Sequence, residues 1–305
     1  MTSANHPRWL VLLNPKSGLR SPGMPLLRAM EEAMDGRAEL LFQISRSVDD
    51  GQAKARHAVE QGMETVVVVG GDGMVNSIGT VLVGTATELA VIPAGSGNGW
   101  ARHFGMPLSM AASARALASA VRRTMDVGYV NDRPFFVTCS LAWDAALAEA
   151  FDRYPVRGVL SYVLAGAQEL GTYPRQSFSA QMDGAPDRLF SDPLVFTVAN
   201  LTQYGGGARI APGASADDGW LDLVVLERAN AARAIGRIGA LFQGHVDRIP
   251  EIETHRIRSM RVVRERAGPI QIDGEVMNSG PEVRIEIRPG ALNIRVPPDQ
   301  DTALN

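Results

Sequence analysis

Two glycine-rich segments of this 305-residue chain are of the kind that holds a row of phosphates. Gly70-Gly71-Asp72-Gly73 follows the valine-rich run 65–69, and the segment 94–99 follows the apolar run 89–93. Glycine permits positive φ and close approach of the backbone to a ligand. Amides at the start of a following helix attract anions. Either segment alone is also what a tight strand-to-helix turn requires, but two of them one β–α unit apart favour phosphate binding.

A third polar turn, 14–18, follows the first apolar run of the chain and contains Lys16. Lys16 could add a cation to a phosphate site, although an exposed surface lysine is the plainer interpretation. Neither glycine segment fits the P-loop pattern, and neither gives a dinucleotide fingerprint at a first strand–helix turn. If all three turns open at the carboxyl edge of one parallel sheet, they could together hold a triphosphate.

Acidic residues near glycines form the second group that could do chemistry. Asp273 and Glu275 flank a glycine after the strand-like run 269–272, a pattern that is also common in hairpin turns. Asp218 precedes a glycine and could likewise lie in a turn between strands, and Asp126 could be a surface acid at the end of a helix. The residues alone leave these alternatives open.

The elements that would position these residues change in character along the chain. In the first third, short Val/Ile/Leu runs alternate with amphipathic patterns, which predicts a parallel sheet covered on both faces. Strands are expected at 8–13, 39–44, 65–69 and 89–92, and helices at 26–35, 49–61, 74–83 and 109–123.

From about residue 125 strand patterns dominate, which predicts a mostly antiparallel β domain with a boundary near 124–132. Strands are expected at 133–140, 176–183, 194–199, 220–226, 256–264, 270–272, 283–287 and 292–296, and helices at 160–170 and 231–243.

Composition excludes several classes of protein. With 30 basic and 33 acidic residues the net charge is −3, which argues against a globally basic nucleic-acid binder. A single cysteine, Cys139, excludes an internal disulfide framework and a cysteine-based zinc site. The chain has no run of about 20 apolar residues and no signal-peptide pattern, so we expect a cytoplasmic protein that contacts a membrane transiently.

The motifs together resemble the diacylglycerol kinase and sphingosine kinase catalytic-domain family, in particular its soluble bacterial lipid kinases. The resemblance covers essentially the whole chain. It is carried by LLNPKSG (12–18), VVVVGGDGMVN (66–76), VIPAGSGNGWAR (91–102), MDVGYV (125–130), the segment 198–226, IQIDGE (270–275) and PGALNIRVP (289–297).

This resemblance implies an α/β protein of two domains and an ATP-dependent phosphorylation of a lipid hydroxyl. The ATP-binding domain, residues 1–128 with a returning segment 290–305, would be similar to NAD kinase and phosphofructokinase. Residues 129–289 would form a β-rich, sandwich-like lipid-substrate domain. Diacylglycerol, converted to phosphatidic acid, is the expected substrate.

The resemblance also assigns roles to single residues. Asp273 would be the general base with Glu275 in support, Asp72 would act through the Mg²⁺ of Mg–ATP, and Asp126 would belong to a polar network. A structural Mg²⁺ would take the side chain of Asp218 and the carbonyls of Ser215 and Trp220. ATP would contact Asn14, Ser17, Gly70, Gly71, Asp72, Gly73, Asn76, Gly95, Ser96, Gly97 and Asn98.

Two departures from bacterial diacylglycerol kinases keep other activities open. Met74 stands where many have threonine, and Gly99 where many have aspartate. An apolar residue after GGDG and the PAGSGN wording look more like sphingosine and ceramide kinases, so a sphingoid base or another lipid alcohol is the alternative substrate. A non-catalytic nucleotide- or lipid-binding protein, and a kinase of a soluble nucleotide or sugar, are alternatives of other classes.

The expected partners follow from a lipid substrate. A lipid kinase without a spanning helix must contact the membrane surface, and the stretch 255–266 carries five arginines that could attract anionic lipids. The other interpretation, which we favour, is a strand with a solvated face. A homodimer is left open, and nucleic acid is not expected as a partner.

Overall fold

The computed structural model describes residues 6–14, 24–145, 173–235, 237 and 243–298. The chain divides into two compact units, residues 1–125 with 290–305 (unit 1) and residues 126–289 (unit 2). Two strands, β5 (Val121–Val130) and β18 (Glu282–Val296), contribute residues to both units. The predicted helix 160–170 and the residues Lys16 and Ser17 lie outside the described residues.

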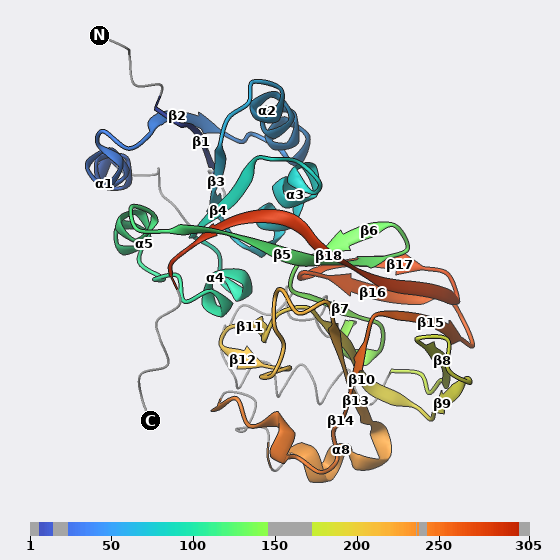
Figure 1. Cartoon of the computed structure of the whole chain (residues 1–305). Helices are drawn as coiled ribbons and strands as arrows, with labels where there is room; N and C mark the ends of the chain where they lie inside the picture. The colour runs from blue at the N-terminus through green and yellow to red at the C-terminus, as the bar shows by residue number, and fades with distance from the viewer. Residues whose placement is uncertain (1–5, 15–23, 146–172, 236, 238–242, 299–305) are drawn as a thin grey trace. The chain divides into compact units, whose positions relative to one another are not determined.

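Unit 1 is built on a parallel sheet in the order β2-β1-β3-β4, with the last part of β18 beside β4 (Figure 1). All six residues of β3 and of β4 are buried, as expected for parallel strands covered on both faces. The strands are β1 (Arg8–Leu13), β2 (Glu39–Ile44), β3 (Thr65–Gly70) and β4 (Glu88–Pro93).

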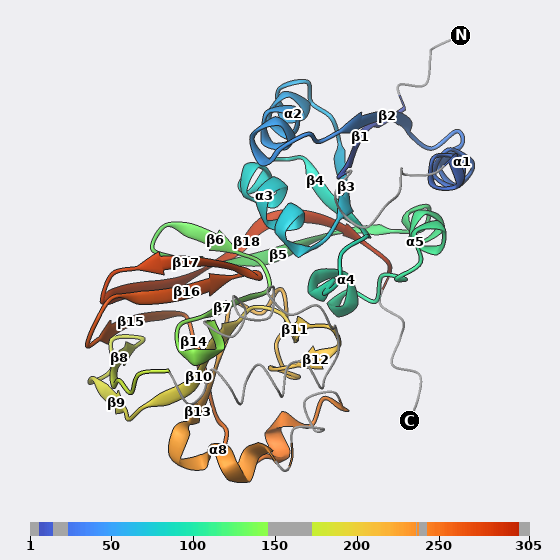
Figure 2. The same ribbon diagram turned by 180° about the vertical axis from the view of Figure 1, so that it is seen from behind.

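Helices cover this sheet in pairs, α1 with α5 and α2 with α3, one pair on each face (Figure 2). Ser47 caps α2 by accepting the Asp50 N–H at 3.1 Å. The predicted helix 109–123 is wrong at its C-terminal end, because β5 already begins at Val121 and pairs as a strand. The helices are α1 (Met24–Met34), α2 (Val48–Glu60), α3 (Asp72–Leu82), α4 (Gly99–His103) and α5 (Met110–Leu117).

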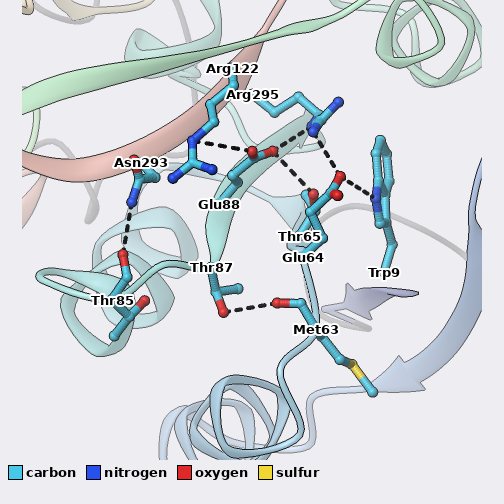
Figure 3. Close-up of polar contacts among 10 residues, drawn as sticks. All are labelled: Trp9, Met63, Glu64, Thr65, Thr85, Thr87, Glu88, Arg122, Asn293 and Arg295. Carbon is cyan, nitrogen blue, oxygen red and sulfur yellow. Dashed lines mark hydrogen bonds and ion pairs between the residues drawn. The ribbon is translucent and has the colours of Figure 1, made fainter. Parts of the chain in front are cut away.

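The returning strand β18 is fixed to unit 1 by a network of charges (Figure 3). Arg295 donates to the carboxylates of Glu88 at 2.5 Å and Glu64 at 2.8 Å, and its guanidinium lies over the Trp9 ring. Glu88 is 1% exposed and also pairs with Arg122 at 3.6 Å. A buried carboxylate is costly unless it is paired, so Glu88 requires the returning strand.

Unit 2 is a sandwich of two mainly antiparallel sheets. One sheet has the order β18-β15-β8-β9, with β5 paired to β18 and β6 paired to β5, and the other has the order β14-β13-β10-β7-β16-β17. The remaining elements of this unit are β6 (Arg133–Phe135), β7 (Thr138–Ser140), β8 (Phe178–Met182), β9 (Arg188–Phe190), β10 (Pro193–Ala199), β11 (Gln203–Gly205), β12 (Ala208–Arg209), β13 (Leu221–Glu227), α8 (Arg228–Ile235), η1 (Val246–Arg248), β14 (Glu253–Ile257), β15 (Ser259–Arg264), β16 (Gly268–Ile272) and β17 (Glu275–Ser279).

The core of unit 2 lies between these sheets and includes Phe178, Phe196 and Ile285. A smaller apolar cluster around Ala199 and Val224 packs on the other face of the β10–β13 pair. The prediction of a two-domain α/β protein with a β-rich second domain is therefore confirmed.

Four strands predicted after residue 132 are wrong in detail, and two of the errors have a visible cause. The run 133–140 is split because the N–H groups of Phe136 and Val137 donate to the Asp273 carboxylate. The run 256–264 is split because the N–H groups of Arg258 and Ser259 donate to Asp183. In each case a carboxylate replaces the neighbouring strand as acceptor. The runs 283–287 and 292–296 are one strand, β18.

Candidate functional site

The two glycine segments of unit 1 leave the sheet side by side. Gly70 at the end of β3 lies opposite Pro93 at the end of β4, and the Ala94 N–H donates to the Gly70 carbonyl at 2.9 Å. Asn14, after β1, donates its N–H to the Val69 carbonyl at 3.2 Å. These predicted nucleotide residues therefore share the carboxyl edge of the parallel sheet, where ligands of such sheets bind.

Gly71 and Gly95 are required because the two loops touch. A Cβ on Gly95 would lie 2.5 Å from the Gly71 Cα, and a Cβ on Gly71 would lie 3.0 Å from the Gly95 Cα. Of the two properties that glycine permits, positive φ is not used at Gly71 or Gly95, and the positive φ of this region belongs to Asn98, at 52°. Close approach of the backbones, rather than left-handed backbone, explains these two glycines.

Asp72, the first residue of α3, connects the first loop to the second. Its carboxylate accepts the N–H groups of Gly99 at 3.0 Å and Trp100 at 3.2 Å, the residues that begin α4. Burial raises the pKa of Asp72, and the hydrogen bonds from Gly99 and Trp100 oppose that shift. The predicted contact of Asp72 with Mg–ATP stays a prediction.

Asn98 closes the second loop on itself. Its Oδ1 accepts the Gly95 N–H at 2.9 Å and its Nδ2 donates to the Gly95 carbonyl at 2.8 Å. Arg102 Nε donates to the Gly97 carbonyl at 3.1 Å, which leaves Ser96 exposed at the tip. The side chain of Asn98 thus shapes the loop that was predicted to hold phosphate.

The departure at Met74 has a structural consequence. A Cβ on Gly70 would lie 2.8 Å from the Met74 Sδ, so this side chain folds back over the end of β3. Asn76, a predicted ATP contact in α3, is half-buried. An apolar thioether therefore covers the first loop where a hydroxyl was expected from bacterial diacylglycerol kinases.

In unit 2, Asp273 and Gly274 form a two-residue hairpin turn. Ile272 pairs with Glu275 across the turn, and the φ angles of Asp273 and Gly274 are 46° and 95°. Two positive φ angles define a type I′ turn, for which Asp-Gly is a favoured pair. The hairpin interpretation is thus correct, and it does not compete with a functional role for the same aspartate.

The carboxylate of Asp273 is buried, at 6% exposure, and is held by the main chain. Its oxygens accept the N–H groups of Phe136 at 2.8 Å, Val137 at 2.8 Å and Thr138 at 3.0 Å. Glu275, two residues on, is exposed. The structure therefore separates the predicted pair into a fixed carboxylate and a solvated one.

Asp126 connects to the Asp273 region through Asn200. The Asn200 Nδ2 donates to the carbonyls of Asp126 at 2.8 Å and Phe136 at 3.1 Å, and Phe136 in turn donates its N–H to Asp273. Asp126 Oδ2 accepts the Gly219 N–H at 2.7 Å. The polar network expected around Asp126 thus includes the turn after Asp218 and the segment that holds Asp273.

The Asp218 carboxylate, predicted as the side-chain ligand of a structural Mg²⁺, contacts other groups in this structure. One Asp218 oxygen accepts the Trp220 N–H at 3.0 Å and the other pairs with Arg256, while Ser215 Oγ donates to Asp217 at 2.9 Å. Across the described residues no three His, Cys, Asp or Glu side chains gather as metal ligands. Magnesium prefers carboxylate oxygens that are free to coordinate, and here a guanidinium takes the cation's place.

The basic stretch does not form a continuous cationic face. Arg256 pairs with Asp218 and Arg261 pairs with Glu282 at 2.9 Å, while Arg264 is buried. The interpretation as strands with a partly solvated face is therefore supported. No helix of the described residues is long and apolar enough to cross a membrane.

Asp144 is a buried carboxylate that sequence reasoning missed. It accepts the N–H groups of Ala142 and Ala145 at 3.1 and 3.0 Å and the Thr197 hydroxyl at 2.5 Å. Burial raises the pKa of Asp144, and these hydrogen bonds oppose the shift. An aspartate inside the apolar run 135–146 was the signal available in the sequence.

Comparison with known proteins finds a family model for each of two successive parts of the chain. The diacylglycerol kinase catalytic domain matches residues 8–130, and the YegS C-terminal NAD kinase beta sandwich-like domain matches residues 138–296. Relatives from Salmonella gallinarum and Salmonella typhimurium, each named "Probable lipid kinase YegS", are 27% identical over 97% of this chain and 98% of their own length.

Solved structures give the same fold. A diacylglycerol kinase from Bacillus anthracis superposes with a TM-score of 0.71 at 18% identity, covering 97% of this chain and 99% of its own. A second crystal structure from that organism gives a TM-score of 0.78 at 21% identity over 97% and 99% of the two chains. With both domains matched in order along 8–296, the chain belongs to the family of diacylglycerol kinase-type catalytic domains followed by a YegS C-terminal beta sandwich-like domain.

Proposed function

We propose that this chain is an ATP-dependent lipid kinase whose substrate is diacylglycerol and whose product is phosphatidic acid. The touching loops around Gly71 and Gly95 carry the proposal, because two glycine turns with no Cβ at their contact come together at one sheet edge, and helix α3, whose N-terminus favours an anion, begins directly after Gly71. The family supports the kinase class. The choice of diacylglycerol rests on resemblance to bacterial members.

In the proposed reaction the γ-phosphoryl group of ATP moves to the lipid hydroxyl and ADP leaves. Asp273 takes the hydroxyl proton. Its carboxylate has about four acceptor sites, and three main-chain N–H groups fix its orientation. Phosphoryl transfer has a loose transition state, so the orientation of the carboxylate matters more than its strength as a base. Glu275 supports it from the solvated side of the turn.

Met74 favours a second candidate substrate. Its side chain covers Gly70 and places an apolar group where many bacterial diacylglycerol kinases carry a hydroxyl. An apolar residue at this position resembles sphingosine-type kinases. A long-chain base is therefore the alternative acceptor. If this protein phosphorylated only long-chain bases in mixed micelles, a long-chain base would replace diacylglycerol as the proposed substrate.

The test uses labelled ATP with Mg²⁺ and micelles of diacylglycerol, of a long-chain base, or of total bacterial lipid. We expect label in phosphatidic acid. Label in no lipid, with ATP still bound, would favour a non-catalytic binding protein, and label in a water-soluble acceptor alone would favour a soluble-substrate kinase.

A second pair of variants tests ATP binding by the glycine loops of unit 1. Gly95→Ala forces apart two loops whose backbones touch, so we expect ATP affinity to fall at least tenfold in a fluorescent-nucleotide titration. Gly213→Ala, at a glycine without a positive φ and with nothing within 4 Å of its Cβ position, is the matched control and should bind ATP as the unmodified chain does. Equal ATP binding by both variants would contradict the assignment of the loops.

A further inference from the structure

Arg264, at the end of β15, is a buried cation at 2% exposure. Its guanidinium donates only to main-chain carbonyls. The acceptors are Leu141 at 3.3 Å, Pro269 at 3.0 Å, Gly268 at 3.2 Å, Ser279 at 3.1 Å and Gly280 at 2.8 Å.

Four of the five carbonyls belong to the two ends of one hairpin. Gly268 begins β16, Ser279 ends β17, and these two residues pair with each other. The guanidinium therefore closes the open end of the β16–β17 hairpin, whose turn is Asp273–Gly274. Asp273 lies five residues after Gly268, which is roughly 17 Å at the usual rise of a strand.

The fifth carbonyl and the Asp273 carboxylate connect the hairpin to the same neighbouring segment. Asp273 at the tip accepts N–H groups from residues 136–138, and Arg264 at the base bonds Leu141 just beyond β7. Between these points β16 pairs with β7 through Gln271–Ser140 and Ile272–Cys139. The hairpin is thus attached at both ends to residues 136–141.

An arginine side chain is suited to bonding the carbonyls at both ends of the hairpin. Within the described part of the chain no carboxylate pairs with it, so carbonyl dipoles alone compensate the charge, and burial lowers its pKa. A guanidinium presents donors in a planar fork that reaches several carbonyls at once. A lysine presents three donors from a single point and cannot span both strands.

We propose that Arg264 is a positioning residue that fixes the β16–β17 hairpin on residues 136–141 and thereby sets the Asp273 carboxylate. The catalytic half of this inference rests on the proposed function, in which Asp273 is the base. The attachment of the hairpin does not, and the two are measured separately.

The test compares Arg264→Lys with Arg261→Lys, an exposed arginine of the same strand that pairs with Glu282. Amide hydrogen exchange of Phe136, Val137 and Thr138 reports the hold on Asp273. Steady-state assays give kcat and the KM values for lipid and ATP. For Arg264→Lys we expect at least tenfold faster exchange at these amides and at least tenfold lower kcat, with the KM for ATP within twofold. Arg261→Lys should change none of these quantities.

Two outcomes would overturn the inference. One is a folded Arg264→Lys protein whose exchange at the three amides stays within twofold of the unmodified chain. The other is faster exchange with kcat unchanged. If the unmodified chain phosphorylates no lipid, the proposed function fails and the exchange result alone decides the attachment.

A measurement on the unmodified chain covers the case in which Arg264→Lys does not fold. Under native conditions with low urea, the amides of residues 136–138 and those of the Gly268–Ser279 pair should exchange through one common opening. Separate openings that differ tenfold in exchange rate would show that tip and base move independently, and would overturn the inference.

Discussion

Unit 2 contains two Asp-Gly turns with nearly the same backbone and different surroundings. Asp183–Gly184 has φ angles of 49° and 74°, and Asp273–Gly274 has 46° and 95°. Both carboxylates accept main-chain N–H groups, from Arg258 and Ser259 at the first turn and from the segment 136–138 at the second. Asp183 is exposed, whereas Asp273 is 6% exposed.

The comparison shows which contacts any such turn needs and which contacts only Asp273 has. Holding a strand end by a carboxylate is common to both turns, so it does not require burial. What distinguishes Asp273 is a third N–H donor, the connection to Asp126 through Asn200, and the guanidinium at the base of its hairpin. These additions restrict the carboxylate far more than a hairpin needs.

The largest expected difference comes from neutralising each aspartate. Asp273→Asn should lower kcat for lipid phosphorylation by about 10²–10⁴, the usual contribution of a general base. Asp183→Asn should leave kcat within twofold, because that turn joins strands of the other sheet and has no part in the proposed chemistry. Labelled-phosphate assays on both folded variants measure this, and equal losses would remove the distinction between the turns.

The glycines of the two turns allow a finer test. A Cβ at Gly274 or at Gly184 meets nothing within 4 Å, so an alanine there adds only left-handed backbone strain, of about 1–2 kcal/mol. Urea unfolding should show similar destabilisation for Gly274→Ala and Gly184→Ala. Only Gly274→Ala should also lower kcat, by less than Asp273→Asn does. A loss of kcat in Gly184→Ala would contradict this expectation.

Asp218–Gly219 is a third Asp-Gly pair, and its carboxylate meets a cation instead of a row of amides. Because Arg256 occupies Asp218, Mg²⁺ without nucleotide should not raise the melting temperature of the unmodified chain. Arg256→Ala removes a surface pair worth about 0–1 kcal/mol and should make the melting temperature depend on Mg²⁺.

Arg258→Ala is the matched control for this variant. Arg258 also lies over the Trp220 ring but does not pair with Asp218. A magnesium-dependent melting temperature in the unmodified chain, measured by differential scanning fluorimetry with and without a chelator, would restore the metal site predicted at Ser215, Asp218 and Trp220.

The smallest effect is expected from the exposed arginine of β15. Hydrogen bonds from Arg261 and Arg284 lower the pKa of Glu282 to about 2. A lowered carboxyl pKa adds stability above the ordinary value of 4.5, and that stability is lost as pH falls toward 2. Arg261→Ala should therefore move the acid-unfolding midpoint slightly upward, as followed by circular dichroism. An unchanged midpoint would mean that Arg284 alone maintains the shift.

Sequence patterns predicted strand bounds well where buried residues are periodic or continuous along the chain. The parallel strands β1 and β2 have the predicted bounds, because short apolar runs between helical patterns have few other solutions. The splits at Phe136 and Arg258 could not be predicted, since each depends on a carboxylate distant in sequence.

The candidate site was predictable in residue type but not in arrangement. The glycine loops follow their strands as expected, yet Gly71 and Gly95 are glycines because of each other, which no single segment can reveal. Asn200 and Arg264 look ordinary in the sequence, because their importance lies in carbonyls contributed by other strands. Arg264 even falls within the stretch 255–266, for which the sequence favoured a strand with a solvated face, whereas Arg264 itself is buried.

The contact of Arg295 with Glu88 and Glu64 has a consequence for the order in which the protein is made. Unit 1 begins the chain, but one strand of its sheet arrives only with residues 290–296. During synthesis the first 125 residues leave the ribosome without β18, the second neighbour of β4, and with the Glu88 carboxylate lacking Arg295. Pairings so distant in sequence form slowly. Completion of unit 1 must therefore follow translation of the whole of unit 2, which lies between its two parts in the sequence.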